Sequence, residues 1–327
     1  MEKSAASVGV TPDPSSPIDR LMRARARHGE TWGTLDAETL REFERIFEEV
    51  GGRGRKILEI GSGNGFNCVL FGLLGAAEVR GVEVVPEAVA IAEAVRTEVD
   101  PGLPVSFQLG DAGQPLPFPD ASFDALLLIE VISHVVTPDV SGFLREMARV
   151  VRPGGILYIQ DGNNARSWKR RRENYEIWRR FENGPITEGG ETVHSHRVGK
   201  PYVELRADIA RAAEPALSAE DARRIAERTF RFDAARVREA AREFRETGRL
   251  PHSPFQEKTC PIEPISRSYI EELVDPIDLM KDLRAFGCEI LACRTRRKLP
   301  GDFLWRRLPF LTMRVANGFT VVARKLA

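Results

Sequence analysis

The chain has 327 residues, enough for one large domain with an insertion, and its 48 Lys and Arg residues balance its 48 Asp and Glu residues. This balance excludes a general attraction to nucleic acid or to an acidic polymer, so either partner would need a local basic patch. The four cysteines have no paired spacing and no apolar run near the N-terminus is long enough for a signal peptide or a membrane span, so we expect a cytoplasmic protein.

The N-terminal segment is predicted to be a tail followed by an arm. Residues 1–17 are rich in Ser, Ala and Pro, a composition typical of a mobile tail. Residues 18–27 have helical spacing and lead into a short loop that contains Trp32. Asp36 then resembles an N-cap for a helix that runs to Val50, with an apolar face that should cover a sheet.

Residues 56–65 predict a buried strand that breaks into a glycine turn. An apolar run ends at Ile60, and Gly61, Gly63 and Gly65 follow it directly, before a segment with helical spacing. Alternate glycines allow positive φ angles and a close approach of a ligand to the backbone, while the N–H groups of the next helix can face a polar ligand. The spacing Gly-x-Gly-x-Gly differs from the Gly-x-Gly-x-x-Gly of dinucleotide enzymes, which disfavours a nicotinamide oxidoreductase.

Three further elements follow in an order that predicts alternating strands and helices. A second apolar strand, residues 79–85, carries Glu83 about twenty residues after the turn, where a carboxylate could accept both hydroxyls of a ribose. A third strand, residues 105–109, precedes Asp111, and a fourth, residues 125–129, precedes Glu130. Parallel strands joined by right-handed crossovers bring these carboxyl ends to one rim of the sheet.

These motifs resemble the class I S-adenosylmethionine-dependent methyltransferases, in particular the group with Leu-Pro-Phe-x-Asp-x-Ser-Phe-Asp before the fourth strand, here residues 116–124. The match covers roughly residues 35–161 and resumes near residue 265. The resemblance implies an α/β fold, with a Rossmann-like seven-stranded doubly wound sheet, and S-adenosyl-L-methionine as cofactor. It says little about the methyl acceptor.

The resemblance also implies a role for each matching residue. The glycine turn packs against the methionine part of the cofactor, Glu83 holds the ribose, and Asp111 lies near the adenine amine. Residues 130–134 line the methyl-transfer cleft, and residues 150–155 match the loop that enters strand five. The predicted cofactor-binding residues are Glu59, Gly61, Ser62, Gly63, Gly65, Glu83, Val84, Asp111, Ala112 and Glu130.

About a hundred residues after strand five exceed what the common core needs, and we expect them to form a largely helical cap over the acceptor. The basic run at residues 169–172 could neutralise a phosphate or carboxylate of an acceptor, or, with Trp168, Tyr175 and Trp178, suit RNA. The glutamates close by favour a solvated helix face instead. His194 and His196 lack a third ligand at a convincing spacing, so no metal site is expected.

The C-terminal part is predicted to complete the sheet. Residues 265–273 resemble a capped helix, residues 279–286 continue as helix, and residues 289–295 and 318–324 form the last two strands. Between these strands an apolar and basic segment, residues 296–317, could rest on a membrane surface or grip a lipid-like acceptor. Apolar residues among basic ones more often belong to half-buried structure, which favours a piece packed on the domain or at a dimer contact.

The predicted divisions are residues 1–34 for the tail and arm, 35–162 for the cofactor half of the core, 163–264 for the cap, and 265–327 for the C-terminal strands. The candidate catalytic bases are His134, which follows strand four, His196 from the cap and His28 from the arm. In the family an N-terminal arm often covers the cofactor cleft, so His28, Thr31 and Trp32 could contact cofactor or acceptor, although Trp32 could also simply anchor the arm.

We therefore expect methyl transfer to oxygen or nitrogen of a small molecule, with a secondary metabolite, a sugar and a lipid-linked glycan all open as the acceptor. The alternatives are a non-catalytic S-adenosylmethionine-binding regulatory or scaffold protein, and an RNA methyltransferase. His134 itself could act as a base or only pack against cofactor or helix. The oligomeric state is left open by the sequence.

Overall fold

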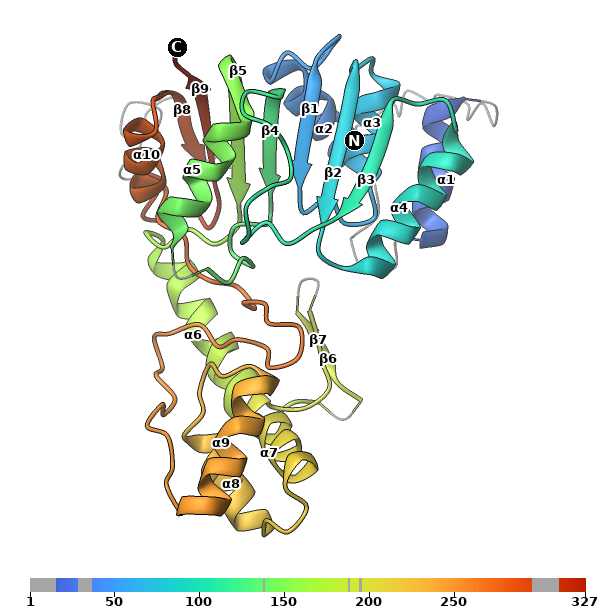
Figure 1. The fold of residues 1–327 in the computed structure, drawn as a ribbon. Coiled ribbons are helices and arrows are strands. Elements are labelled where there is room, and N and C mark those ends of the chain that lie inside the picture. The colour runs from blue at the N-terminus through green and yellow to red at the C-terminus, as the bar shows by residue number, and fades with distance from the viewer. Residues whose placement is uncertain (1–15, 29–36, 138, 188, 194–195, 296–311) are drawn as a thin grey trace, which may run out of the picture. The chain divides into compact units, whose positions relative to one another are not determined.

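The computed structural model describes residues 16–28, 37–137, 139–187, 189–193, 196–295 and 312–327. The chain divides into two compact units, residues 1–111 and residues 112–327. Its main sheet has seven strands in the order β3-β2-β1-β4-β5-β9-β8 (Figure 1). The predicted α/β fold with a Rossmann-like seven-stranded sheet is therefore confirmed, while the finer division of the chain into arm, core and cap stays a prediction.

The first unit is built from short apolar strands that alternate with helices. Its elements are α1 (Pro17–His28), α2 (Ala37–Glu49), β1 (Lys56–Ile60), α3 (Phe66–Leu73), β2 (Glu78–Glu83), α4 (Pro86–Val99) and β3 (Val105–Leu109). β2 pairs in parallel with β1 and with β3, so Val79 lies opposite Ile57 on one side and Val105 on the other. The central residues of β1 are fully buried, as expected for a parallel strand covered on both faces.

Helix α1 is fixed to the first unit by an apolar stripe. Leu21 and Ala24 lie in one buried cluster with residues of α3 and α4, among them Val69 and Val95. The Nε of Arg20 donates to the carbonyl oxygen of Val99, 2.9 Å away, at the end of α4. A cation at a helix C-terminus also satisfies one of the last carbonyl groups of that helix. The arm helix expected at residues 18–27 is therefore packed against the core of this unit.

The second unit contains the rest of the main sheet and most of the helices. Its elements are β4 (Phe123–Ile129), α5 (Val140–Val150), β5 (Val151–Asp161), α6 (Trp168–Asn183), β6 (Glu191–Val193), β7 (His196–Val198), α7 (Tyr202–Ala213), α8 (Ala219–Glu227), α9 (Ala234–Thr247), α10 (Pro276–Ala285), β8 (Cys288–Thr295) and β9 (Phe319–Lys325). β4 and β5 are parallel, whereas β9 is antiparallel to both β5 and β8. β6 and β7 form a separate two-stranded hairpin.

The region expected to form a cap is largely helical and has its own small apolar cluster. Helices α7, α8 and α9 share buried small side chains such as Ala210, Ala222 and Ala241. A buried ion pair joins Glu182 of α6 to Arg206 of α7, and Arg206 also donates to the carbonyl oxygen of Ala226 at the end of α8. Small side chains allow the helices to approach closely, and the guanidinium satisfies a carbonyl group that the end of α8 leaves open.

The predicted helix at residues 265–273 is wrong. This segment consists of turns and isolated bridges, and its backbone bonds to distant segments. Glu272 N–H donates to the carbonyl oxygen of Ser133 at 2.9 Å, and Val274 N–H donates to that of Asn163 at 2.8 Å. In a helix these N–H groups would bond to carbonyl groups four residues earlier. Here they bond to distant segments, so tertiary contacts override the local helix propensity.

The start of strand five also differs from the expected loop. Residues 151–155 belong to β5, where Val151 pairs with Phe123 and Ile156 pairs with Ala125, so extra residues bulge from the strand between these pairs. Within this bulge Gly154 has a φ of +78°, which an L side chain rarely adopts. The glycine pair therefore permits a bulge rather than a separate loop.

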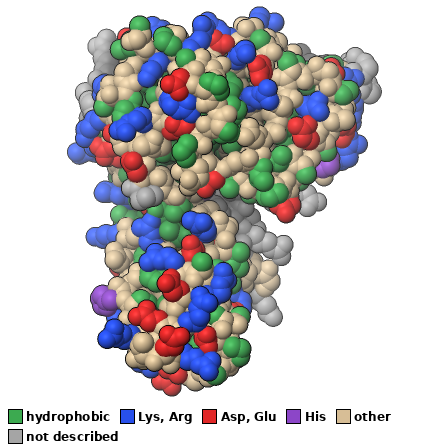
Figure 2. Space-filling view, in the orientation of Figure 1, with side chains coloured by type: hydrophobic (Ala, Val, Ile, Leu, Met, Phe, Trp, Pro, Cys, Tyr) green, Lys and Arg blue, Asp and Glu red, His purple; other side chains and the backbone are tan. Residues whose placement is uncertain are grey.

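The hypothesis that the apolar and basic segment at residues 296–317 contacts a membrane or a lipid-like acceptor falls mostly outside the described residues. Residues 296–311 of the apolar and basic segment lie outside them, while Met313 and Ala316 are buried. No helix among the described residues has the length and apolar character needed to span a membrane. Figure 2 shows Lys and Arg interspersed with Asp and Glu over the described part of the α6–α9 region on this face.

Candidate functional site

The turn between β1 and α3 has the backbone conformation that the glycine pattern predicts. Gly61, Gly63 and Gly65 have φ angles of +68°, +51° and +76°, all in the left-handed region. The N–H groups of Gly61 and Ser62 donate to the carbonyl oxygen of Val82 in β2, at 2.7 and 3.1 Å. The turn is thus anchored to the neighbouring strand before α3 begins. Gly63 has the positive φ that the glycine pattern allows, and its role in cofactor binding stays a prediction.

Two of these glycines are needed for different physical reasons. A Cβ on Gly65 would lie 2.4 Å from the Phe107 ring and 2.7 Å from the Cβ of Ala92, so the packing of β3 and α4 leaves no room for a side chain. A Cβ on Gly63 would meet no atom of the described residues within 4 Å. The side of the turn at Gly63 is therefore open, and a ligand can approach its backbone closely.

The Glu83 carboxylate at the end of β2 is bonded to this turn. One oxygen accepts from the N–H of Gly63 at 2.9 Å, and the other accepts from Val84 and Val85 at 2.8 and 3.0 Å. Its 8% exposure leaves the group almost buried. Each carboxylate oxygen has more than one lone-pair direction, so these bonds leave capacity for a hydroxyl donor. The first unit thus brings together the glycine turn and the acidic residue predicted for the ribose.

Glu59 lies beneath the turn and not on its open side. It is 2% exposed, and its two oxygens accept from Asn67 Nδ2 at 2.8 Å and from Cys68 Sγ at 2.9 Å in α3. Burial raises the pKa of Glu59 to about 7, against the lowering effect of these two hydrogen bonds. Burial and the adjacent carboxylate also raise the pKa of the Cys68 thiol. Its predicted role in cofactor binding stays a prediction, while its observed contacts tie β1 to α3.

The residues next to the turn suit a nucleoside with one apolar face. Val84, Val85 and Leu109 follow or end β2 and β3, and they are 60%, 46% and 54% exposed. Asp111 is exposed two residues beyond Leu109. The buried Ser62 hydroxyl has no hydrogen-bond partner among the described residues. Apolar side chains for a base, a carboxylate for hydroxyls and an unsatisfied hydroxyl in the turn together fit S-adenosylmethionine.

The candidate base from the arm is partly placed. The carbonyl oxygen of His28 accepts from Asn64 Nδ2 in the glycine turn, at 3.1 Å, so the end of α1 lies beside this turn. Thr31, Trp32 and His194 lie outside the described residues. His196 begins β7, but its side chain is also outside them. No group of three or more metal-ligating side chains occurs in the part of the chain that the structure describes.

In the second unit, Ala112 is the first residue and Glu130 follows β4 directly. Glu130 has a φ of +56°, unusual for a residue with a side chain. Its N–H donates to the carbonyl oxygen of Gln160 at 2.8 Å, and its carboxylate accepts from the N–H of Gly162 at 3.0 Å. The strained residue is therefore held by the end of β5, and such strain is often found at functional sites.

His134, the candidate base after β4, is half-buried and oriented by a distant segment. Its Nδ1 lies 3.2 Å from the carbonyl oxygen of Tyr269, and the Tyr269 N–H donates to the His134 carbonyl oxygen at 3.3 Å. A carbonyl oxygen only accepts, so Nδ1 carries the proton in this contact. In the neutral ring Nε2 is then the nitrogen that can accept a proton.

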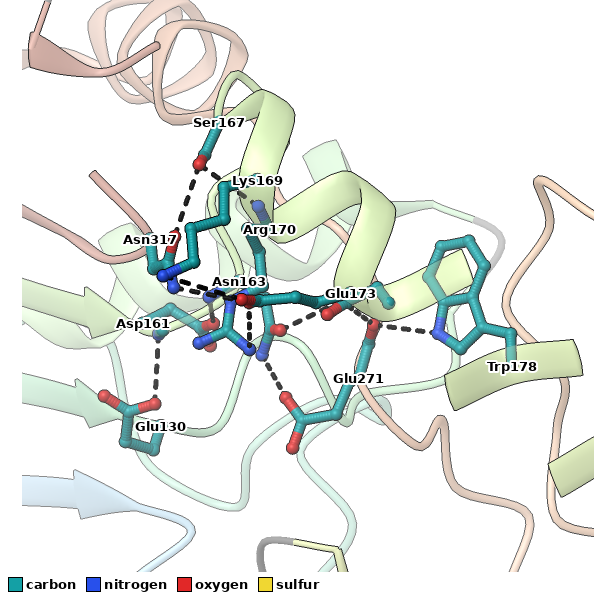
Figure 3. A network of polar contacts seen from close by, with 12 residues as sticks. Glu130, Asp161, Asn163, Ser167, Lys169, Arg170, Glu173, Trp178, Glu271 and Asn317 are labelled. Carbon is teal, nitrogen blue, oxygen red and sulfur yellow. Dashed lines mark hydrogen bonds and ion pairs between the residues drawn. The ribbon is translucent and has the colours of Figure 1, made fainter. Parts of the chain in front are cut away.

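A buried polar network supports the loop between β5 and α6 (Figure 3). Asn163 accepts from Asn174 at 3.0 Å and donates to the carboxylate of Glu271, while Asn174 and Trp178 both donate to the Glu271 carbonyl oxygen, at 2.8 and 3.2 Å. Asp161 accepts from the N–H groups of Asn163 and Ser133, at 2.8 and 3.2 Å. Four segments of the second unit are thus joined through one set of buried groups.

Sequence reasoning missed the residues that hold these candidates in place. Tyr269 and Glu271 lie in the segment predicted to be a helix, and Asn163 and Asn174 are unremarkable polar residues in the sequence. Their partners are far along the chain, as the 108 residues between Asn163 and Glu271 show. The only local signal was polar side chains at positions that periodicity would place on the buried side of α6, such as Asn174 beside Trp178.

Comparison with known proteins gives consistent matches over the same part of the chain. A family described as a methyltransferase domain matches residues 58–159. Norajmaline N-methyltransferase of Rauvolfia serpentina is 36% identical over 122 residues, covering 37% of this chain and 40% of that protein. Methyltransferase GfsG of Streptomyces halstedii is 39% identical over 157 residues, covering 47% and 49%.

A third relative, O-methyltransferase resE of Aspergillus sclerotiorum, is 32% identical over 168 residues, covering 49% of this chain and 62% of that protein. The chain thus spans about half the length of the curated relatives it matches. The matched residues run from β1 to β5 and include the glycine turn and Glu83. Residues 58–159 therefore match a methyltransferase domain, and the relatives that share this part of the chain are named as methyltransferases.

Proposed function

We propose that this protein transfers a methyl group from S-adenosylmethionine to an oxygen or nitrogen of a small-molecule acceptor. The observation that carries the proposal is the glycine turn bonded to Glu83, inside a domain that matches the methyltransferase family. The relatives bear the names of O- and N-methyltransferases, which supports these two acceptor atoms.

The chain's own residues divide into those that hold the cofactor and those that act on the acceptor. The backbone at Gly61 and Gly63 would face the amino-acid part, Glu83 the ribose hydroxyls, and Val84 and Asp111 the base. When bound, the cofactor supplies a methyl group that its sulfonium already activates. The protein's task is then to orient the acceptor and, for a hydroxyl, to remove its proton.

His134 is the residue we propose for proton removal. Its Nδ1 is engaged with the carbonyl oxygen of Tyr269, which fixes the ring and leaves Nε2 as the basic atom. Glu130, whose carboxylate accepts from the Gly162 N–H, lies four residues before His134 and would help to position the acceptor or the cofactor. A His whose tautomer is set by a hydrogen bond is a suitable general base near neutral pH.

The RNA methyltransferase alternative receives less support from the surface. Acidic and basic side chains are interspersed over the described part of the α6–α9 region on the face that Figure 2 shows. The basic run of α6 includes ion pairs such as Arg172 with Glu176 at 3.2 Å. Proteins that bind RNA typically present a continuous basic face, which this mixed surface lacks. A non-catalytic S-adenosylmethionine-binding protein would also bind the cofactor, so only a measurement of turnover distinguishes it from an enzyme.

Two measurements test the proposal. Calorimetry with S-adenosylmethionine, S-adenosylhomocysteine and NADH should give heat with the first two and none with NADH. Incubation with S-adenosylmethionine and a panel of hydroxylated and amine-bearing small molecules should then release S-adenosylhomocysteine. Binding without release from any acceptor would favour the regulatory or scaffold alternative, and heat with NADH alone would overturn the cofactor assignment.

A further inference from the structure

The first turn of α6 carries cations where a helix normally carries acidic residues. Ser167 caps this helix by accepting from the N–H of Arg170, and the first turn holds Lys169 and Arg170 but no acidic residue. The N-terminus of a helix has a partial positive charge, so cations there are unfavourable for stability. A helix start that carries cations in place of the preferred acidic residues often marks a functional position.

Arg170 projects from this turn toward the loop that follows β5. A Cβ placed on Gly162 would lie 4.0 Å from an Nη of Arg170 and 3.1 Å from the carboxylate of Glu130. Because Gly162 also donates its N–H to Glu130, the guanidinium lies at the same edge of β4 and β5 as the proposed acceptor-positioning residue (Figure 3). A side chain at this position would press on the Glu130 carboxylate.

Most of the hydrogen-bonding capacity of this guanidinium is unused. The side chain of Arg170 is 15% exposed, and its buried Nε has no hydrogen-bond partner among the described residues. An Nη lies 3.7 Å from Glu173, beyond hydrogen-bond distance. Glu173 is shared with Lys169 at 3.8 Å and with Asn317 at 3.3 Å, so its charge is already partly compensated.

Arg170 also lines one end of a groove of about 510 Å³ along α6. Three arginines, Arg170, Arg179 and Arg180, and two glutamates, Glu173 and Glu176, account for the charged part of its lining. The volume is that of a small-molecule site, but a lining this rich in charge does not suit a wholly apolar ligand.

The charge of the groove favours an anion. The lining holds three arginines and two glutamates, so its formal charge is positive. Glu173 is shared between Arg170 of the lining, at 3.7 Å, and Lys169 outside it, at 3.8 Å, and Glu176 pairs with Arg172 outside it. The arginines of the lining therefore exceed its uncompensated acidic groups. Guanidinium groups with open donors bind planar or tetrahedral oxyanions through two parallel hydrogen bonds.

We propose that Arg170 is a specificity-determining residue of the acceptor site and that the methyl acceptor carries a carboxylate or phosphate group, which Arg170 binds beside Glu130. This proposal rests on the proposed methyltransferase function and narrows its acceptor class. The anionic group would anchor the acceptor at the start of α6, while the rest of the molecule occupies the groove or faces the end of β4.

The test uses the full-length protein labelled with ¹⁵N-arginine, with and without saturating S-adenosylhomocysteine. Sodium phosphate and sodium benzoate are titrated at constant ionic strength, and the Arg170 Nε–H signal, assigned by its loss in Arg170→Gln, is followed. We expect a saturable shift with at least one anion. Phosphate alone indicates a phosphorylated acceptor, and benzoate alone indicates a carboxylate.

Three variants control for general electrostatics. Anion binding measured by calorimetry should weaken roughly tenfold or more in Arg170→Gln, because a charge-assisted pair is lost, and should be partly kept in Arg170→Lys. Arg172→Gln, on the same helix but with a side chain 76% exposed, should bind as the wild type does. No saturable shift with either anion, or equal weakening in Arg172→Gln, overturns the proposal. If S-adenosylhomocysteine binds but the anions do not, only the acceptor class is wrong, whereas absent S-adenosylhomocysteine binding refutes the proposed function itself.

Discussion

The Nδ1 atom of His134 lies 3.2 Å from the carbonyl oxygen of Tyr269, although 135 residues separate the two along the chain. The phenol of Tyr269 in turn accepts a hydrogen bond from Arg231, whose guanidinium lies 5.0 Å from the centre of the Tyr269 ring. The orientation of the candidate base therefore depends on a segment before α10 and on a residue between α8 and α9.

His134→Asn should lower kcat for a hydroxyl acceptor by roughly 100-fold or more, the usual contribution of a general base. Asparagine can still donate to the Tyr269 carbonyl oxygen but has no basic nitrogen in the place of Nε2. The affinity for S-adenosylhomocysteine, measured by calorimetry, should not change. An unchanged kcat would show that His134 only packs at this position.

Glu83→Gln should weaken S-adenosylmethionine binding by roughly tenfold to a hundredfold, because a charge-assisted acceptor is replaced by a neutral one. The same change weakens the bond from the Gly63 N–H, so the turn also loses support. Calorimetry measures the affinity. Glu87→Gln, an exposed carboxylate in the first turn of α4, is the matched control and should bind as the wild type does.

Gly63→Ala and Gly65→Ala should separate cofactor binding from stability. At Gly63 the new methyl group meets no atom of the residues that the structure describes, so the cost is the left-handed strain of about 1–2 kcal/mol, while the cofactor loses its close approach. At Gly65 the clash with Phe107 adds to the strain, for a total of about 3 kcal/mol or more. Urea unfolding and S-adenosylhomocysteine titration distinguish the two. A Gly63→Ala protein with full affinity would remove this side of the turn from the site.

Glu59 should make the free energy of unfolding depend on pH. Its pKa is raised from 4.5 to about 7, so the folded state keeps a proton that the unfolded state releases, and stability falls as pH rises through this window. The full effect is on the order of 3 kcal/mol. Relative to the wild type, Glu59→Gln should therefore gain stability between pH 5 and pH 8 of that order. Urea unfolding at several pH values checks this, and a pH-independent difference would contradict it.

Arg206→Met should destabilise the second unit by about 3–5 kcal/mol, because it leaves Glu182 as a buried charge without its cation. The side chains of Arg206 and Glu182 are 1% and 2% exposed. The double variant Glu182→Met/Arg206→Met should cost far less, since no charge then remains buried. Urea unfolding of the single and double variants forms the test. Similar losses in both would indicate that packing, not charge, explains the effect.

Local patterns predicted the elements between residues 56 and 161 well. The apolar run ended by glycine at residues 56–65 is strand β1 and its turn, as predicted, and Pro86, which suits the first turn of a helix, begins α4. The glycine turn and Glu83, predicted to lie near each other from a short stretch of sequence, are joined by a hydrogen bond in the structure, while their role in cofactor binding stays a prediction. Residues close together in the sequence determine the strand, the turn and the helix start.

The acceptor side could not be predicted in the same way. The segment around Tyr269 has the sequence of a capped helix, yet its N–H groups bond to Ser133 and Asn163, which no local window contains. The basic run of α6 indicated a solvated face, whereas Arg170 lies next to Gly162 and is 15% exposed and Arg172 is 76% exposed. Tertiary contacts therefore decide which of several similar residues lies at the site.

Strand β9 lies between β5 and β8, so its residues pair on both sides. Tyr158 and Val322, which face each other across β5 and β9, come from opposite halves of the chain. Closing so long a loop is entropically costly, and contacts of this kind slow folding. We therefore expect the β5–β9 pairing to form late in refolding. Until it forms, β5 presents an unpaired apolar edge, and the protein should be most prone to aggregate at that stage.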